Sequence, residues 1–554
     1  MSYVGGMSVA DRRWWETRWF FALLLIVAAM PVLWPQIPPL VDLPGHMGRY
    51  RVELDIVSSN ALQRYFEFRW AVIGNLGIDL LIIPLASAFG VELALKLIVI
   101  SIPVLTTAGI IWTAREVHGR FVPTALFAIP FVFSYPFNFG FINFSLSMAL
   151  ALLAFALWLR LDDYSHSVRS VIFVPLSFLL WLVHVFGWGV LGLLVWSAEL
   201  VKIRDRNSHW TKALVTAARK CLPLCAPIVP MLLWRSGDAG GPTAGFLNIG
   251  SKILALFSAV RDRWLFWDSI AVGVAVVLLA SALFDKHLSF SRRLAIPSAV
   301  LALIFVLLPS EVFGSAYADM RLIPFVLMLA VVAIRPRDTT NHATIQRLAV
   351  LGTVFVGLRL TGNAVSYWIA DNETTSELTA IKYIAPGSSV LSLVGDSCGK
   401  IWAMPRHSHL GSMVIVRKQG FSNDQWQIPG AQLLRVTYMK ARPFDADPSE
   451  ITISGDCKKR ILANAAKLAG VSAAAVYVQR KYRTTDEALE EFPRDAFDYV
   501  WLIRPEGYTA PPPADLRPIW SGRSSWLFQV IHTRDSATRH TSNAPAIPTT
   551  PSDT

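Results

Sequence analysis

Long apolar runs dominate the first 370 residues of this chain. A helix needs about 20 apolar residues to cross the hydrocarbon core of a bilayer. Only 16% of all residues are charged, whereas soluble domains have about 25%. The pattern therefore predicts an α-helical polytopic membrane protein. The clearest spans are residues 20–34, 76–89, 94–113, 141–159, 214–234, 270–284, 296–308, 322–334 and 348–368.

Two further apolar regions bring the predicted total to about eleven or twelve spans. Residues 124–135 form a short run that carries Pro130 and is followed by Pro136. Residues 171–198 are too long for one helix and contain glycines near their middle. We expect a tight pair of short helices there, turning around His184.

The net charge of +12 would suggest nucleic-acid binding in a soluble protein. In a membrane protein, excess Lys and Arg in short loops set topology by the positive-inside rule. The chain shows no zinc-finger or helix-turn-helix spacing, so no nucleic-acid partner is expected. It also shows no P-loop, dinucleotide fingerprint or serine-nucleophile elbow, which argues against ATP-driven transport.

The basic loops predict the orientation of the chain. Arg12, Arg13 and Arg18 precede the first span and place the N-terminus in the cytoplasm. The basic stretches at 202–212, 286–293 and 335–347 are cytoplasmic by the same rule, while 237–267 and 310–319 fall outside. We therefore expect a multi-pass protein of the bacterial inner membrane. Its transmembrane domain covers residues 1–369, and the following domain is periplasmic.

The C-terminal part, residues 370–531, changes character. Short β-rich runs at 389–394, 413–416 and 499–503 alternate with a helical stretch at 456–468, which predicts an α/β domain. Cys398 and Cys457 are its only cysteines, and an oxidising compartment predicts a disulfide between them. Residues 532–554 are rich in Ser, Thr and Pro and are expected to be disordered.

The first outer loop, residues 37–69, carries the densest group of polar candidates. Apolar residues recur at helical spacing from 43 to 57, which predicts an amphipathic helix on the membrane surface. Asp42 and His46 are four residues apart and share a helix face. With Arg49 and Arg51 they could form an acid/base and phosphate-binding group. Alternatively, Asp42 is a plain N-cap and His46 a surface histidine.

Three later segments hold further candidates. Asn138 and Asn143 lie among aromatic residues and suit sugar contacts, or else form polar contacts between helices in an aromatic belt. His184 is ionisable within an apolar run, which marks a functional site unless it is a neutral histidine bonded across helices. Arg321 opens a span and could bind a lipid phosphate, or form a salt bridge with Asp319 or Glu311.

Together these segments resemble the GT-C superfamily of polytopic glycosyltransferases, most closely its uncharacterised bacterial members. The likeness lies in a retained first span, a long outer loop that opens with Asp42 and His46, the span layout and the trailing domain. It implies a polyprenyl-phosphate sugar donor, transfer on the outer face and Asp42 as catalytic base. Members that use a metal carry a second acidic motif in a later outer loop. No clear Asp-x-Asp is found there, so no cofactor is expected, and a divalent metal is possible but not favoured.

The mechanism that this resemblance implies is an inverting displacement onto a lipid, glycan or protein acceptor. Asp42 would activate the acceptor hydroxyl, with His46 beside it. Arg321, with Arg49 or Arg51, would bind the donor phosphate. Residues His184, Asn138, Asn143 and Asp319 are assigned to substrate binding. The alternatives are a lipid or polysaccharide transporter or assembly factor without catalysis, and an O-antigen ligase or polymerase. The absence of internal repeats speaks against a transporter.

Overall fold

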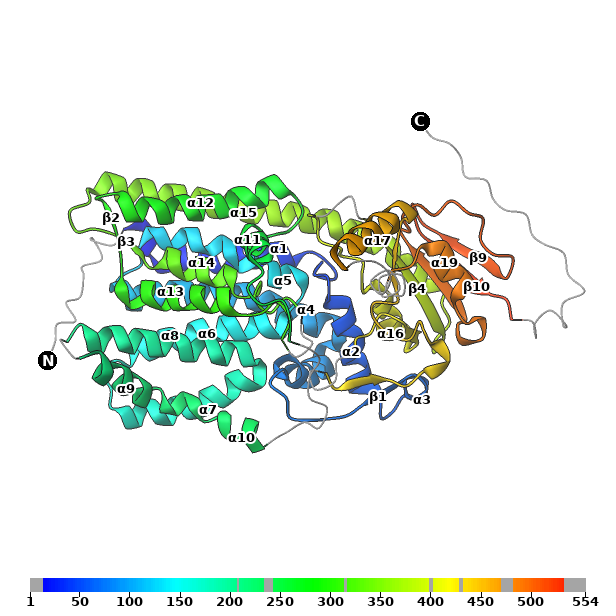
Figure 1. Ribbon diagram of the computed structural model, residues 1–554, viewed down its shortest axis with the longest axis horizontal. Coiled ribbons are helices and arrows are strands. Elements are labelled where there is room, and N and C mark those ends of the chain that lie inside the picture. Colours follow the sequence, from blue (N-terminus) through cyan, green and yellow to red (C-terminus); the bar gives the residue numbers. More distant parts are fainter. Residues whose placement is uncertain are drawn as a thin grey trace, which may run out of the picture.

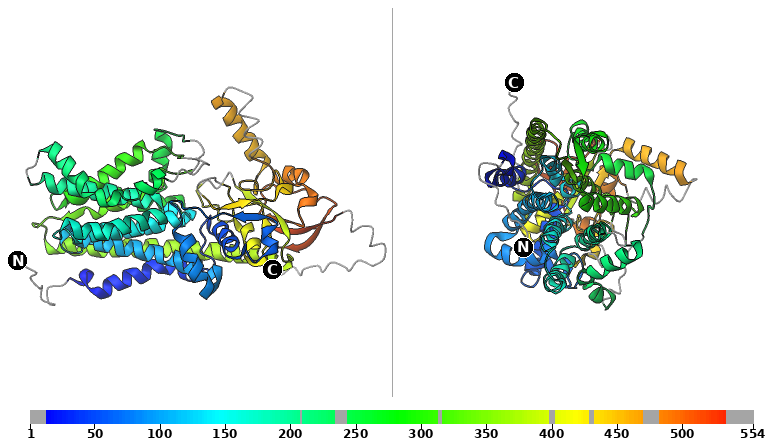
Figure 2. Two further views of the ribbon diagram at one scale, coloured as in Figure 1. Left: turned by 90° about the horizontal axis from the view of Figure 1, so that it is seen from below. Right: turned by 90° about the vertical axis from the view of Figure 1, so that its left-hand side faces the viewer.

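The computed structural model describes residues 13–206, 209–233, 243–312, 316–397, 402–427, 432–469 and 482–532. A bundle of helices occupies one end of the molecule, and the C-terminal domain sits on the other end (Figure 1). The view along the long axis shows the helices packed side by side (Figure 2). The predicted fold class, a polytopic helical protein with a C-terminal α/β domain, is confirmed.

Among the described residues, six helices are long and apolar enough to cross a membrane. A seventh span is possible if a pair bent by 54° counts as one. The six are α4 (Gly77–His118), α6 (Ile142–Arg160), α7 (His166–Val183), α8 (Val185–Arg204), α12 (Leu265–Phe284) and α15 (His342–Glu377). The bent pair joins α9 (Trp210–Lys220) to η4 (Leu222–Cys225) and α10 (Ile228–Leu233), and shorter helices are α1 (Arg18–Leu33), α11 (Ile249–Phe257), α13 (Arg292–Leu307) and α14 (Ile323–Val332).

This number of full-length spans is smaller than the eleven or twelve predicted. The predicted spans 76–89 and 94–113 correspond to two helices that meet at a kink at Gly90, with φ of +74°, and together form the element α4. The ambiguous run at 124–135 is a buried 3₁₀ helix, η3 (Pro123–Phe133). The predicted turn at His184 is confirmed, because His184 has extended backbone between α7 and α8. Both helices are longer than expected.

The predicted basic loops gather at the end of the bundle away from the C-terminal domain (Figure 1). There β2 (Leu288–Phe290) pairs with β3 (Ile334–Pro336) in an antiparallel ribbon. Asp162, at the end of α6, accepts ion pairs from Arg169 and Arg293 at 2.8 Å and from Lys202 at 2.7 Å. Loops that charge assigns to one side of the membrane therefore do lie on one side of the bundle.

The C-terminal domain is built on a mixed sheet with the strand order β5-β4-β8-β10-β9, to which β7 adds by pairing with β4. The strands predicted at 389–394 and 499–503 are confirmed as β4 (Ser389–Asp396) and β8 (Tyr499–Ile503), and the predicted helix as α17 (Gly455–Ala469). α17 projects from the domain (Figure 2). The other elements are β5 (Phe421–Ser422), β7 (Ile451–Ile453), α19 (Thr485–Glu491), β9 (Leu516–Ser521) and β10 (Trp526–Val530).

The strand predicted at 413–416 is wrong. These residues form α16 (Met413–Lys418), and its first four side chains are all buried. A short apolar run buried on all sides does not distinguish helix from strand by its periodicity. The predicted tail, residues 532–554, lies outside the described residues from 533 onward.

Ion pairs and hydrogen bonds fasten the C-terminal domain to the bundle. α15 continues through the predicted domain boundary at 369/370 and is followed by η5 (Leu378–Tyr383). Asp268 of α12, which pairs with Arg359 of α15 inside the bundle, accepts a hydrogen bond from Trp402 of the C-terminal domain at 2.7 Å. Arg406 of the C-terminal domain pairs with Asp262 of the bundle. Arg417 of α16 bonds both oxygens of Glu92 in α4 at 2.9 Å. These contacts fix the domain over one end of the helices.

Candidate active site

The first outer loop is an integral part of the junction between the bundle and the C-terminal domain. Its helix α2 (Leu43–Asp55) is followed by α3 (Asn60–Gln63) and β1 (Phe66–Phe68). β1 pairs in antiparallel fashion with β6 (Leu434–Val436) of the C-terminal domain. The prediction that this helix lies on the membrane surface is wrong, because nine of its residues are buried between protein elements.

Two glycines let α2 pack closely against the C-terminal domain. A Cβ at Gly45 would lie 2.5 Å from the Trp426 ring, and one at Gly48 would lie 2.8 Å from Nε2 of Gln425. The same Gln425 amide donates a hydrogen bond to the Gly45 carbonyl at 3.0 Å. Because a Cβ atom at either glycine would clash, only glycine allows α2 to pack this closely against the segment around Trp426.

The opposite face of α2 is held by an ion pair. Arg49 bonds Asp79 at the start of α4 at 2.9 Å and donates to the Tyr50 hydroxyl at 3.0 Å. The Asn143 amide accepts from the Ile78 backbone at 2.7 Å. Arg49 and Asn143 are therefore engaged inside the protein. Arg51 pairs with Asp55 along the helix at 2.8 Å.

The segment around α5 (Tyr135–Phe139) fixes the position of the Asp42 backbone. The Asp42 amide donates to the Phe139 carbonyl at 2.9 Å. Gly140 has φ of +102°, and a Cβ there would lie 2.8 Å from the Asp42 nitrogen. The Asn138 side chain donates to the Arg261 carbonyl and accepts from the Tyr367 hydroxyl at 2.6 Å. Asn138 thus supports this segment from within.

The Asp42 side chain occupies an N-cap position but does not act as a cap. It accepts no hydrogen bond from the amides of α2, all of which are described. The residue is only 7% exposed, and its Oδ1 lies 3.7 Å from Nε2 of His409. The pKa of Asp42 is raised to about 7, chiefly by burial; Asp447 adds to the rise, while His409 and Arg321 oppose it. The carboxylate therefore faces charged groups of two domains.

Arg321 and His184 approach Asp42 from the bundle. The Arg321 guanidinium stacks over the Phe141 ring at 4.1 Å and lies 5.9 Å from the Phe144 ring. His184 meets the same Phe144 ring edge-on at 5.7 Å and accepts from the Phe186 amide. Asp319 forms an ion pair with Lys252 at 2.7 Å. The structure thus brings Arg321, His184 and Asp42 to one end of the bundle.

His46 lies on α2, one helical turn after Asp42, and faces Trp426 of the C-terminal domain. Its ring centroid is 5.1 Å from that of Trp426, and it interacts with the Gly140 backbone. Burial lowers the pKa of His46 well below its usual value, and the nearby Arg49 adds to the effect. Its Nδ1 has no hydrogen-bond partner in the described part of the chain. His46 is therefore a neutral imidazole.

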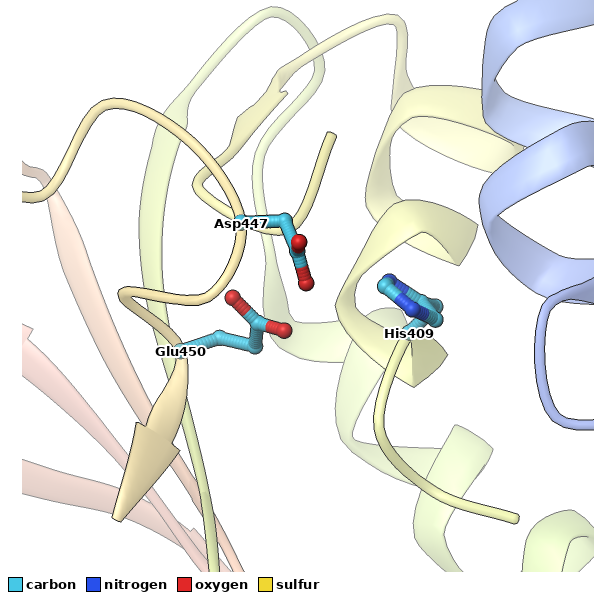
Figure 3. A group of neighbouring side chains, drawn as sticks. All are labelled: His409, Asp447 and Glu450. Atoms are coloured by element: carbon cyan, nitrogen blue, oxygen red, sulfur yellow. The ribbon is translucent and has the colours of Figure 1, made fainter. Parts of the chain in front are cut away.

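A group of side chains that the sequence did not single out faces Asp42 from the C-terminal domain. His409, Asp447 and Glu450 place one possible ligand atom each within 4.8 Å of one another, and the three side chains point toward a common centre (Figure 3). The available signal was an Asp-x-Asp, formed by Asp445 and Asp447 with Glu450 close behind. It lies in the C-terminal domain, not in an outer loop between spans.

The cysteines of the bundle and of the C-terminal domain differ in their bonding. Cys457 is disulfide-bonded, and Cys398 lies outside the described residues. Cys221 and Cys225, at the bend between α9 and α10, are free thiols. The predicted disulfide between Cys398 and Cys457 stays a prediction.

Comparison with known proteins found no matching family model and no matching curated protein. Two solved structures are similar over nearly the whole chain. They are ArnT from Cupriavidus metallidurans in the apo state and the same protein bound to undecaprenyl phosphate. Each is 12% identical and covers 92% of this chain and 97% of its own. The TM-scores are 0.43 for the apo structure and 0.42 for the lipid-bound one.

Proposed function

We propose that this protein is a membrane glycosyltransferase that moves a sugar from a polyprenyl-phosphate donor to an acceptor hydroxyl. Transfer takes place at the end of the bundle that carries the C-terminal domain. The proposal joins the sequence resemblance to the position of Asp42, Arg321 and His184 at one end of the bundle, where Arg321 interacts electrostatically with the other two. A carboxylate and a guanidinium at the same end of the helices are the two charges that such a reaction needs.

In the proposed reaction, the Asp42 carboxylate takes the proton of the acceptor hydroxyl. The acceptor oxygen forms a bond to the anomeric carbon while the bond from that carbon to the phosphate oxygen breaks. The polyprenyl phosphate leaves with the bonding electrons, and the configuration at the anomeric carbon inverts. A positioned base of this kind contributes roughly 10²–10⁴-fold to a rate.

Arg321 stabilises the departing phosphate in this scheme. Arg321 is only 8% exposed, and its guanidinium is stacked on Phe141, so the direction of the guanidinium is set before the donor arrives. Fixed charge in a site poor in water stabilises a leaving group effectively. His184 and the neutral His46 orient groups around the reacting carbon.

The remaining predicted site residues hold the framework. Arg49, Asn138, Asn143 and Asp319 already bond to partners inside the protein. We therefore assign them to positioning α2, the Asp42 backbone and the start of α14, rather than to substrate contact. Arg51, bound to Asp55, belongs to the same group.

One observation carries the proposal: Asp42 is buried without acting as a helix cap. A carboxylate kept for capping would bond the free amides of the first turn, which stabilises a helix by about 1 kcal/mol. Instead this carboxylate turns toward His409 and lies within electrostatic range of Arg321. The Asp42 carboxylate is therefore buried without the stabilisation of a capping hydrogen bond, as expected of a reactive group.

The test is Asp42→Asn in the full-length protein, with Asp55→Asn as matched control at the other end of the same helix. Asn keeps the shape of the side chain and loses its basicity. We expect both variants to fold, with sugar transfer from polyprenyl-phosphate donors at least about 100-fold lower in Asp42→Asn. The control should transfer at the normal rate. Full transfer activity in Asp42→Asn would overturn the assignment of the base.

A further inference from the structure

We infer that His409, Asp447 and Glu450 form a binding site for a divalent cation at the junction of the C-terminal domain and the first outer loop. Their ligand atoms lie within 4.8 Å of one another, and Figure 3 shows the three side chains converging from separate segments. His409 precedes η6 (Leu410–Ser412), Asp447 lies in a loop, and Glu450 directly precedes β7.

The His409 ring is oriented as a metal ligand. Its Nδ1 lies 3.0 Å from the Asp424 carbonyl oxygen, which can only accept a hydrogen bond, so Nδ1 carries the proton. Nε2 is thus the ring atom left to bind a cation, and it faces the side where Asp42 lies. Metal-binding histidines commonly donate their other ring nitrogen to a carbonyl in this way.

The ring is also held in place from behind. It packs against Trp426 with a centroid distance of 4.4 Å. The Asp424 carboxylate accepts from the amide and the hydroxyl of Ser412 at 2.7 and 2.8 Å, which fixes the segment whose carbonyl receives the His409 proton. The orientation of Nε2 is therefore built into the fold.

Glu450 supplies an independent observation. It is fully buried, and within the described part of the chain no other residue donates a hydrogen bond to its carboxylate, whose nearest polar contacts are its own backbone amide and the Asp447 carboxylate. Its electrostatic neighbours Asp447 and Asp424 are both acidic. A buried carboxylate without a donor, facing other carboxylates, requires either a cation or a proton. Because His409 offers a third ligand atom beside it, we infer a cation.

The donor set indicates the kind of cation. One imidazole nitrogen and two carboxylates suit Zn²⁺ or Mn²⁺, and three protein ligands leave positions open for water or a substrate oxygen. Because His409 lies 3.7 Å from Asp42, a bound cation would stand beside the proposed base and could contact the donor phosphate. This role rests on the proposed function, whereas binding itself does not.

The experiment measures binding without substrate. Full-length protein in detergent is stripped with a chelator, freed of the chelator and titrated calorimetrically with Zn²⁺ alone and with Mn²⁺ alone. We expect one equivalent of at least one of the two ions to bind. Affinity should fall by at least roughly 10–100-fold in Glu450→Gln and in His409→Ala, since even outer-sphere changes cost that much.

Glu53→Gln is the matched control. Glu53 is also a buried carboxylate whose oxygens have no partner among the described residues, but it lies on α2 near Arg49 and Asp79. The Glu53→Gln variant should bind the ion with the same affinity as the unaltered protein. Thermal unfolding gives a second readout, because a ligand that binds only the folded state raises Tm. The shift should appear in the control and be lost in Glu450→Gln, whose near-identical shape preserves the fold.

Each outcome decides the inference. Absence of saturable binding of either ion, or equal binding by Glu450→Gln, would overturn it and leave a proton shared between Asp447 and Glu450 as the explanation. Binding that depends on Glu450, in a protein whose Asp42→Asn variant transfers normally, would support the cation site and refute the proposed base. The two proposals therefore fail separately.

Discussion

Replacing Gly140 with alanine should displace the proposed catalytic carboxylate without touching its chemistry. Gly140 has φ of +102°, and a Cβ at this position would lie 2.8 Å from the Asp42 nitrogen and 2.9 Å from its Cβ. Ordinary contacts begin near 3.4 Å, so the Asp42 backbone must move by roughly half an ångström. That movement also strains the bond from the Asp42 amide to the Phe139 carbonyl.

Two costs follow from this geometry. A non-glycine residue in the left-handed region costs roughly 1–2 kcal/mol, and overpacking a close contact costs typically about 1–3 kcal/mol more. For catalysis, a misplacement of about 1 Å can lower a rate by ~100-fold. A shift about half that size should lower sugar transfer by roughly tenfold or more.

Gly119→Ala separates the two costs. Gly119 has φ of +73°, and no described heavy atom lies within 4 Å of its ideal Cβ. This variant carries the backbone strain without the contact. We expect both variants to unfold at lower temperature than the unaltered protein, Gly140→Ala the more so, and only Gly140→Ala to lose transfer. Equal activities of the two variants would refute the view that this contact positions Asp42.

Arg49→Met should destabilise the protein by about 3–5 kcal/mol, because it leaves the buried Asp79 carboxylate without its partner. Thermal unfolding in detergent measures this loss. The control Arg51→Met removes a partly exposed ion pair and should cost under about 1 kcal/mol. A reporter fused after Tyr383, at the end of η5, should be active only outside the cytoplasm, since the basic loops lie at the opposite end of the bundle. Activity confined to the cytoplasm would reverse the predicted orientation.

The local pattern of the sequence was enough to predict several elements. Apolar runs and basic loops predicted the membrane bundle, and alternating short runs predicted the C-terminal α/β domain. The break at His184 followed from the length of its apolar run and the glycines within it. Asp42, Arg321 and His184 were recognised because charged groups at the ends of apolar helices are costly to bury. Each of these signals is local, because it can be recognised within a short stretch of the sequence.

Other features depended on contacts between distant segments. The charge of Arg49 is balanced by Asp79, and the helix that contains Arg49 is buried by a domain that begins more than 300 residues later. Residues 413–416 form a helix and not a strand, and because all four side chains are buried, their periodicity could not reveal this.

The group formed by His409, Asp447 and Glu450 was also decided by the tertiary structure. Its members come from three segments of the C-terminal domain and meet Asp42 only because α2 docks there through Gly45 and Gly48. Hydrophobic periodicity reports which face of an element is buried. It does not report which distant element covers that face, and the chemistry of this site depends on that pairing.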